Sequence, residues 1–430
     1  MKRRCAIGKR RVMQMKKRLL CFTMLLTVTI SAITFTNNVK AATKWNTNKS
    51  VTKEENGIKY SAYLTEDGKE SWIYQIKLSK KITKLTLPKE INQAKLTRVG
   101  FGKELYNKGE DEDAYQNLFG DTIEPWHNCY GDMSNDDKNK QTIETVAIPS
   151  TVNQLEIATF SGMKKLKSVV IPEQTASVPA YTFAKCSALS KVTFSKNMNE
   201  IDSTAFVKSN QVKTFSCPKA NKTFAVKKGM LTTRSGKTLV LVPNKMKKLT
   251  IPSSVKEIKA NALNGSQATS IVIPKSVKKI GAKALESKKI TKVSLSSKNK
   301  TYKMANNCIY RKSNGTLTAV LVKTKKITIP SKVKVIDDTV SVMGKIGTKN
   351  QVHIPKSVKK VVEDWMFFGD SATVYFHGTK PPVIVSKFKG NEFTALPIFN
   401  KVYVPKKAKK TYIKWAKDRD GLKWNNLHTF

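Results

Sequence analysis

Apolar residues recur every 23 positions through the middle of this 430-residue chain, in the same order each time. Three consecutive units carry them at Ile143, Val146, Ile148, Leu155, Phe160 and Met163, then at Leu166, Val169, Ile171, Val178, Phe183 and Cys186, and then at Leu189, Val192, Phe194, Ile201, Phe206 and Ser209. A fixed period of this size is typical of stacked supersecondary units, because one unit cannot bury its own apolar face. The spacing therefore predicts an extended solenoid, a fold that offers a long surface to partners.

Each unit contains a short block in which apolar and polar residues alternate, usually closed by proline, as in residues 327–330 and 402–405. Alternation is the pattern of a strand with one buried face, and proline ends the strand because it cannot donate to the ladder. An Ala-Phe or Ala-Leu pair follows, as at 205–206 and 284–285, and suits a single helical or 3₁₀ turn on the convex side. We count about twelve copies of the block.

Two longer units show a second, larger period. Pro218 to Pro252 and Ser296 to Pro330 each span 34 residues, and the two stretches lie 78 residues apart. Residues 221–224 (Asn-Lys-Thr-Phe) match residues 299–302 (Asn-Lys-Thr-Tyr). The match predicts an extra hairpin in each long unit and indicates duplication of a block of several repeats.

The chain divides into a leader, a solenoid and two caps. Residues 57–76 alternate in polarity around Asp67-Gly68, which predicts a β-hairpin in an N-terminal cap over 42–81. The solenoid is expected over 82–405, and residues 406–430 are expected to form a C-terminal cap helix, amphipathic over 406–415. Both ends of a stack need a cap, because an end repeat otherwise exposes an unpaired edge.

An acidic insertion over 101–142 interrupts the first repeat and holds ten carboxylates together with Trp126, His127 and Cys129. We interpret it as a solvated loop that offsets neighbouring lysines. A Ca²⁺ site with oxygen ligands is one alternative, although the carboxylates lack the EF-hand order. A carboxylate pair for glycoside hydrolysis is another, and Asp111 and Glu124 are the residues to test.

The first 41 residues are typical of a secretory signal peptide. A basic stretch precedes an apolar run from Leu19 to about Phe35, and Val39-Lys40-Ala41 fits a cleavage site, so the mature chain would start at Ala42. An uncleaved anchor is the alternative, but the run is short for a span, and no later stretch is long enough. Initiation at Met15 in place of Met1 would give a more ordinary basic region. The expected location is extracellular, with wall association as an option.

The formal net charge is +48, and outside the leader it comes overwhelmingly from lysine. Only four arginines follow the leader, namely Arg98, Arg234, Arg311 and Arg419. Specific recognition of bases and phosphates depends on the guanidinium fork, so a lysine-dominated secreted chain argues against a nucleic-acid partner. Its charge instead favours loose adhesion to an anionic polymer.

The sequence contains no recognisable catalytic or metal-binding motif. The four cysteines after the leader (Cys129, Cys186, Cys217 and Cys308) are scattered, too few for a disulfide scaffold and without metal-ligand spacing. None of the four histidines stands in the context of an activated nucleophile, and no phosphate-binding glycine loop appears. We therefore predict no enzyme activity, no cofactor and no metal.

The order strand-Ile-Pro, Val-x-x-Ile-Gly (277–281) and Thr-Phe-Ala-Lys-Cys-Ser-Ala-Leu (182–189) resembles the BspA-like leucine-rich repeat family over about 82–410. The resemblance implies an α/β, strand-rich leucine-rich-repeat solenoid. It also implies a secreted or surface protein that adheres to host matrix or to other cells. Residues 261–263 and 283–285 depart from the motif, with Leu in place of Phe.

The candidate binding site is the outward face of the stacked strands. Each strand presents one outward residue between two buried ones, and towards the C-terminus these are Thr328, His353, Tyr375 and Tyr403. Equivalent positions should stack about 4.8 Å apart, in a ladder that could stack on sugar rings or clasp a peptide. A flanking outward row makes the same face basic, and it contains Lys191, Lys248, Lys292, Lys326 and Lys401. The alternative is that Thr and Tyr are simply good strand residues.

These observations predict an adhesin that holds host matrix, glycan or anionic wall polymer through many weak contacts. The expected partner is an extracellular protein or glycan. An extracellular hydrolase on a repeat scaffold and a passive wall-associated structural protein are the alternatives. The sequence specifies neither the ligand nor the oligomeric state.

Overall fold

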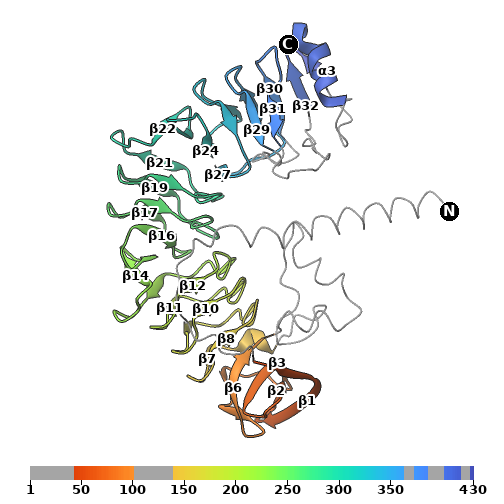
Figure 1. The fold of residues 1–430 in the computed structure, drawn as a ribbon, viewed down its shortest axis with the longest axis vertical. Coiled ribbons are helices and arrows are strands. Elements are labelled where there is room, and N and C mark those ends of the chain that lie inside the picture. Colours follow the sequence, from red (N-terminus) through yellow and green to blue (C-terminus); the bar gives the residue numbers. More distant parts are fainter. Residues whose placement is uncertain (1–42, 101–138, 363–371, 386–400, 418–426) are drawn as a thin grey trace, which may run out of the picture. The chain divides into compact units, whose positions relative to one another are not determined.

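The computed structural model describes residues 43–100, 139–362, 372–385, 401–417 and 427–430. These residues form a strand-rich β-solenoid with one short α-helix, α3 (Lys409–Lys417) (Figure 1). The expected signal peptide and nearly all of the acidic insertion lie outside them. None of the helices in the described ranges has the length and apolar character needed to cross a membrane.

The N-terminal sheet has the strand order β1-β2-β3-β6-β5, and a further strand, β8, pairs with β6. Its strands are β1 (Trp45–Glu55), β2 (Ile58–Thr65), β3 (Glu70–Leu78), β5 (Glu90–Ile91), β6 (Ala94–Val99) and β8 (Gln154–Leu155). The expected hairpin is present, because β2 and β3 pair antiparallel around the turn at Asp67-Gly68. Strand β1 was not expected, since its polar sequence lacks an apolar stripe.

The repeats stack through parallel strands that pair in register. Three sheets hold them, and their strands are β4 (Lys84–Thr86), β7 (Thr145–Ala147), β9 (Ser168–Val170), β11 (Lys191–Thr193) and β13 (Thr214–Ser216), then β17 (Lys248–Thr250), β19 (Ser270–Ile273) and β21 (Lys292–Leu295), then β25 (Lys326–Thr328), β28 (Gln351–Ile354), β30 (Thr373–Phe376), β32 (Lys401–Val404) and β33 (Leu427–Thr429). Val169, Val192 and Phe215 are direct register partners, as the 23-residue period requires.

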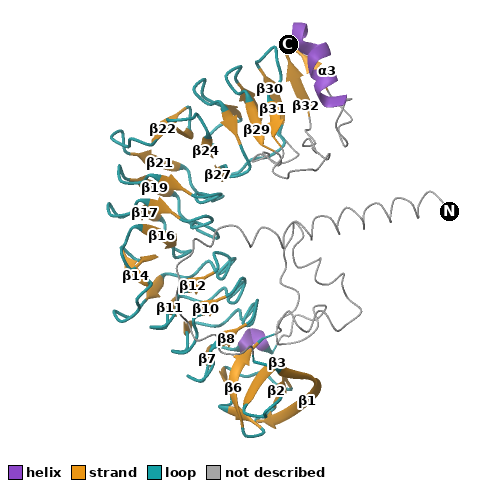
Figure 2. Ribbon diagram, viewed as in Figure 1, coloured by secondary structure: helices purple, strands orange, loops and turns teal. Residues whose placement is uncertain are grey.

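A second set of short strands runs along another side of each unit, so Figure 2 shows strands alternating with loops along the stack. These strands are β10 (Ser177–Val178), β12 (Glu200–Ile201), β18 (Glu257–Ile258), β20 (Lys279–Ile280), β26 (Val335–Ile336), β29 (Lys360–Val362) and β31 (Val383–Val385). The Ala-Phe segments that follow are single hydrogen-bonded turns, for example with Ala184 N–H donating to Tyr181 O at 2.9 Å, and they do not extend into helices.

Aromatic rings stack inside the solenoid at the same 23-residue interval. The ring centroids of Phe160 and Phe183 lie 5.5 Å apart, and those of Phe183 and Phe206 lie 5.7 Å apart. All three side chains are buried. The interior therefore repeats the sequence period directly, with each phenyl ring packed on its equivalent in the next unit.

Both long units contain the predicted extra hairpin. The first consists of β14 (Phe224–Lys227), β15 (Met230–Thr233) and β16 (Thr238–Leu241), and the second of β22 (Tyr302–Ala305), β23 (Cys308–Arg311) and β24 (Leu317–Leu321). In each, the first two strands pair antiparallel over four residues, and the third pairs parallel with a later strand, β18 in the first unit and β27 (Ser341–Met343) in the second. The 78-residue period is therefore present in the structure.

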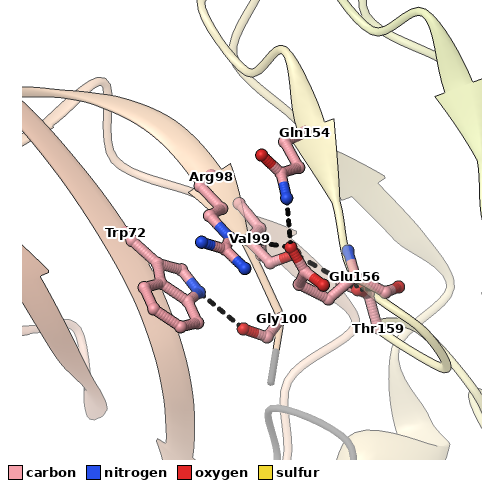
Figure 3. Close-up of polar contacts among 7 residues, drawn as sticks. All are labelled: Trp72, Arg98, Val99, Gly100, Gln154, Glu156 and Thr159. Carbon is pink, nitrogen blue, oxygen red and sulfur yellow. Dashed lines mark hydrogen bonds and ion pairs between the residues drawn. The ribbon is translucent and has the colours of Figure 1, made fainter. Parts of the chain in front are cut away.

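A buried ion pair joins the N-terminal sheet to the first repeat (Figure 3). Arg98 on β6 is only 3% exposed, and its Nε donates to Glu156 Oε1 at 2.7 Å. Its guanidinium carbon lies 3.8 Å from the ring centroid of Trp72, whose indole N–H donates to Gly100 O. Gln154 Nε2 also donates to the same carboxylate. The guanidinium therefore connects strand β3, through Trp72, with the segment after β8, through Glu156.

The other described arginines also serve the fold. Arg234 donates to the backbone oxygens of Asn221 and Pro218, and Arg311 lies over the ring of Tyr302 and donates to its hydroxyl. The described cysteines, Cys186, Cys217 and Cys308, are free thiols. Burial raises the pKa of Cys186 and of Cys308 to about 12, which keeps both thiols protonated and unreactive.

The C-terminal segment is only partly helical. A 3₁₀ turn, η3 (Lys406–Ala408), leads into α3, whose Tyr412 is buried beside Phe376 and donates to Gly378 O at 3.1 Å. The chain then ends in strand β33, which pairs parallel with β32. The sequence predicted a C-terminal cap helix over 406–430 and did not predict this last strand.

Candidate functional site

Four predicted site residues from four different repeats occupy equivalent register positions. Thr328 on β25 pairs with His353 on β28, His353 with Tyr375 on β30, and Tyr375 with Tyr403 on β32. The series continues to His428 on β33, which the sequence analysis did not include. Thr328, His353, Tyr375 and Tyr403 are each flanked by buried apolar neighbours, so strand alternation directs their side chains outward.

The aromatic members of this series stack on one another, and we name His353, Tyr375, Tyr403 and His428 the aromatic ladder. Ring centroids lie 4.4 Å apart from His353 to Tyr375, 4.6 Å from Tyr375 to Tyr403, and 4.9 Å from Tyr403 to His428. The first two pairs are within 10° of parallel. Both faces of each tyrosine ring are therefore covered, and a sugar ring has no free face to stack on there. That part of the expectation is wrong, and the ring edges remain for a ligand.

Two further aromatic residues line the ladder. Nδ1 of His353 lies 2.9 Å from Nε2 of His377, which is hydrogen-bonding distance. The ring of Phe430 lies edge-on to His377 at 5.2 Å and is tilted against Tyr375 at 6.0 Å. Phe430 is 52% exposed, so it gives the ladder an apolar border beside Tyr375 and His377.

Two members of the ladder, His353 and Tyr375, are uncharged at neutral pH. Burial, followed by the nearby positive charges of Lys326 and of His377 when protonated, lowers the pKa of His353 to about 4. Burial and Lys326 also lower the pKa of His377. Burial, together with Tyr403, raises the pKa of Tyr375, so its hydroxyl stays protonated. His353 and Tyr375 therefore present neutral hydrogen-bonding groups beside the cationic Lys326.

The predicted lysines share one register position but are not adjacent. Within one sheet the row reads Lys326, Gln351, Thr373 and Lys401, and in another it reads Lys248, Ser270 and Lys292. Lys191 lies between Ser168 and Thr214. All five lysines are exposed. Neutral residues separate them, which limits the repulsion that directly opposed like charges would create.

The described ranges contain no group of three or more His, Cys, Asp or Glu side chains that could hold a metal ion. The chemistry available on the strand face is therefore hydrogen bonding from phenol and imidazole groups, apolar contact at Phe430, and attraction by ammonium groups.

A family model described as "BspA type Leucine rich repeat region" matches residues 138–228 and 243–373, in six copies. The chain belongs to this family. The match covers the repeats on both sides of the first hairpin, so the leucine-rich repeat fold expected from the sequence is confirmed. No curated protein matches this BspA-type chain.

Several solved structures are similar to this BspA-type chain. The pneumococcal vaccine antigen PcpA is 15% identical, with coverage of 88% of this chain and 98% of that one and a TM-score of 0.37. A leucine-rich repeat protein from Eubacterium ventriosum is 13% identical, with 83% and 94% covered and a TM-score of 0.38. A leucine rich cell surface protein from Faecalibacterium prausnitzii is 13% identical, with 79% and 96% covered and a TM-score of 0.31.

The site residues missed from the sequence are His377, His428 and Phe430. The spacing contained a signal for one of them, because Tyr403 to His428 is the same 25-residue step as Thr328 to His353. The three-residue strand around His428 lacks the closing proline of other blocks and was therefore not recognised. His377 follows its strand directly, where the alternating pattern no longer predicts which way a side chain points.

Proposed function

We propose that this BspA-type repeat protein is a secreted or cell-surface adhesin that binds an extracellular ligand on the strand face of β25, β28, β30, β32 and β33. The family supports a binding role, because leucine-rich repeat solenoids offer extended surfaces to partners. We further propose that residues 42–81 and 406–430 cap the two ends of the stack, and that no catalytic step is involved.

The observation that carries the proposal is the register-matched stacking of the aromatic ladder. Four rings from four strands stack with centroids 4.4–4.9 Å apart and remain half-buried or exposed on the outer surface. The hydrophobic interior does not need these residues, because buried neighbours on the same strands, such as Val374 and Val402, already fill it. Large aromatic side chains gathered on one exposed face are typical of binding surfaces.

A glycan and matrix-protein array tests this function. We expect the full chain to bind a defined set of spots at both 0.05 M and 0.5 M NaCl. A variant with His353→Ser, Tyr375→Ser and Tyr403→Ser should lose them. A matched variant on the N-terminal sheet, Tyr63→Ser with Tyr74→Ser, should bind as the parent does.

The array also separates the alternatives. A passive wall-associated protein would bind anionic spots through charge alone, lose them at high salt, and be indifferent to the ladder substitutions. A hydrolase would degrade its glycan, and Asp111→Asn or Glu124→Gln would abolish that turnover. Either result would contradict the adhesin proposal.

A further inference from the structure

We propose that the ligand of the aromatic ladder is a linear anionic polysaccharide that runs across the strands, bound by ring edges and flanking lysines. This inference rests on the proposed function and deepens it by naming the ligand class and the direction in which it lies. Three properties of the site support it, namely free hydroxyl groups, the spacing of the ladder, and charge.

The tyrosine hydroxyl groups of the ladder are free to bind a ligand. In the described part of the chain, no residue hydrogen-bonds to the hydroxyl of Tyr375 or of Tyr403. Burial favours the neutral form of Tyr375, so its hydroxyl both donates and accepts hydrogen bonds. With both ring faces covered, these edges are the groups that a ligand can reach. Their phenolic hydroxyl groups can hydrogen-bond to the hydroxyl, carboxylate and sulfate oxygens of a polysaccharide.

The spacing of the ladder favours a sugar polymer over a peptide. Strands in a sheet lie about 4.8 Å apart, so a ligand that crosses them meets one rung at each such step. The repeat of an equatorially linked pyranose chain is close to that distance. An extended peptide presents side chains to one face at about 6.6 Å intervals and falls out of register after the second rung.

The charge of the site favours an anionic polymer. Lys326 and Lys401 occupy the same row at opposite ends of a four-strand series, and both are exposed. In the described ranges, neither forms a salt bridge with a carboxylate. The charge of Lys326 already reaches the ladder, because it lowers the pKa of His353 and of His377. A negative group on the ligand would offset that field.

Binding of the full chain to immobilised polysaccharides tests the proposal. The probes are heparin, which carries sulfate and carboxylate groups, hyaluronan, which carries carboxylate only, and neutral cello-oligosaccharide and poly-L-glutamate as comparisons. We expect heparin or hyaluronan to bind, which also identifies the anionic group, and the neutral glycan to bind at least about tenfold more weakly.

Two pairs of matched variants show which groups act. Tyr375→Phe with Tyr403→Phe keeps the stack but removes both hydroxyl groups, and should weaken binding about tenfold or more, since each lost hydrogen bond contributes to affinity. The control, Tyr63→Phe with Tyr74→Phe, alters another stacked pair and should change binding less than twofold. The double variant Lys326→Gln, Lys401→Gln should make polysaccharide affinity less dependent on salt. Its control is the double variant Lys59→Gln, Lys77→Gln, whose lysines are opposed on β2 and β3, and it should change the salt dependence less.

The outcomes separate this inference from the proposed function. Unchanged polysaccharide affinity in the double phenylalanine variant would overturn binding through ring edges. If the chain bound poly-L-glutamate more tightly than the glycans, and the double phenylalanine variant lost that binding, the proposed ligand class would be wrong. The adhesin function would still stand. Both proposals would be overturned if the triple serine variant and the double phenylalanine variant each bound every ligand as tightly as the parent does.

Discussion

Asn221 and Asn299 lie 78 residues apart and make the same four hydrogen bonds. Asn221 Nδ2 donates to the backbone oxygens of Ser195 and Met198, while its Oδ1 accepts from two backbone N–H groups at the start of β14. Asn299 repeats this arrangement with Pro274, Val277 and the start of β22. Each side chain is 1% exposed and uses its full hydrogen-bonding capacity. The amide thus fixes each extra hairpin to the preceding repeat.

Replacing either asparagine should destabilise the solenoid strongly. Asn221→Ala or Asn299→Ala leaves buried backbone groups unpaired, and we expect a loss of about 2–4 kcal/mol in the free energy of unfolding. Urea unfolding followed by circular dichroism measures the loss. The exposed Asn153→Ala is the control and should change stability by less than about 0.5 kcal/mol. Equal midpoints for the buried and exposed variants would show that the amides do not fix the hairpins.

The sequence predicted most of the features that repeat and missed several that occur once. The 23-residue and 78-residue periods predict the stacked strands, the hairpins at 224 and 302, and the register of Thr328, His353, Tyr375 and Tyr403, because identical units must bury identical positions. The cluster of Trp72, Arg98 and Glu156 was missed, since it brings together residues up to 84 positions apart without any repeated pattern.

The ladder itself was only partly predictable. Alternation predicts which residues point outward, but the orientation of a ring depends on its neighbours in space. The tyrosines stack on each other and so lose the free faces that a lone exposed tyrosine would offer. The His353–His377 contact depends on the path of the chain after β30, which strand periodicity does not determine.

Removing Arg98 should disrupt the junction between the N-terminal sheet and the first repeat. Arg98→Ala removes the guanidinium that pairs with Glu156, whose side chain is only 12% exposed, and we expect the free energy of unfolding to fall by about 3–5 kcal/mol. Arg98→Lys should recover part of it, because an ammonium keeps the charge but not the planar stacking on Trp72.

A surface ion pair supplies the control for Arg98. Lys167 and Glu144 are in contact, but the lysine side chain is 65% exposed, so Lys167→Ala should cost at most about 1 kcal/mol. Urea midpoints of the three variants and the parent test the prediction, and similar midpoints for Arg98→Ala and Lys167→Ala would contradict it.

The glycine of the Val-x-x-Ile-Gly motif is required by close packing between successive units. A Cβ on Gly281 would lie 2.5 Å from the backbone nitrogen of Ala260 and 2.9 Å from its Cα, so the neighbouring unit would have to move. We expect Gly281→Ala to lower the free energy of unfolding by about 1–3 kcal/mol. At Gly347 an added Cβ meets nothing within 4 Å, so Gly347→Ala should be neutral or slightly stabilising. The reverse order of the two urea midpoints would rule out this explanation of the motif.

The C-terminal repeats should lose stability in mild acid through His353. An unfolded histidine has a pKa of about 6.5, whereas burial, Lys326 and His377 lower the pKa of His353 in the folded chain to about 4. Well above pH 6.5 the imidazole is neutral in both states, so its protonation does not change the free energy of unfolding. As the pH falls from 6.5 towards 4, the unfolded state takes up the proton first, so the folded state becomes progressively less stable. Urea midpoints measured from pH 7.5 to 4.5 should therefore fall less steeply for His353→Gln than for the parent. Parallel curves for the parent and His353→Gln would show that this imidazole does not control the acid sensitivity.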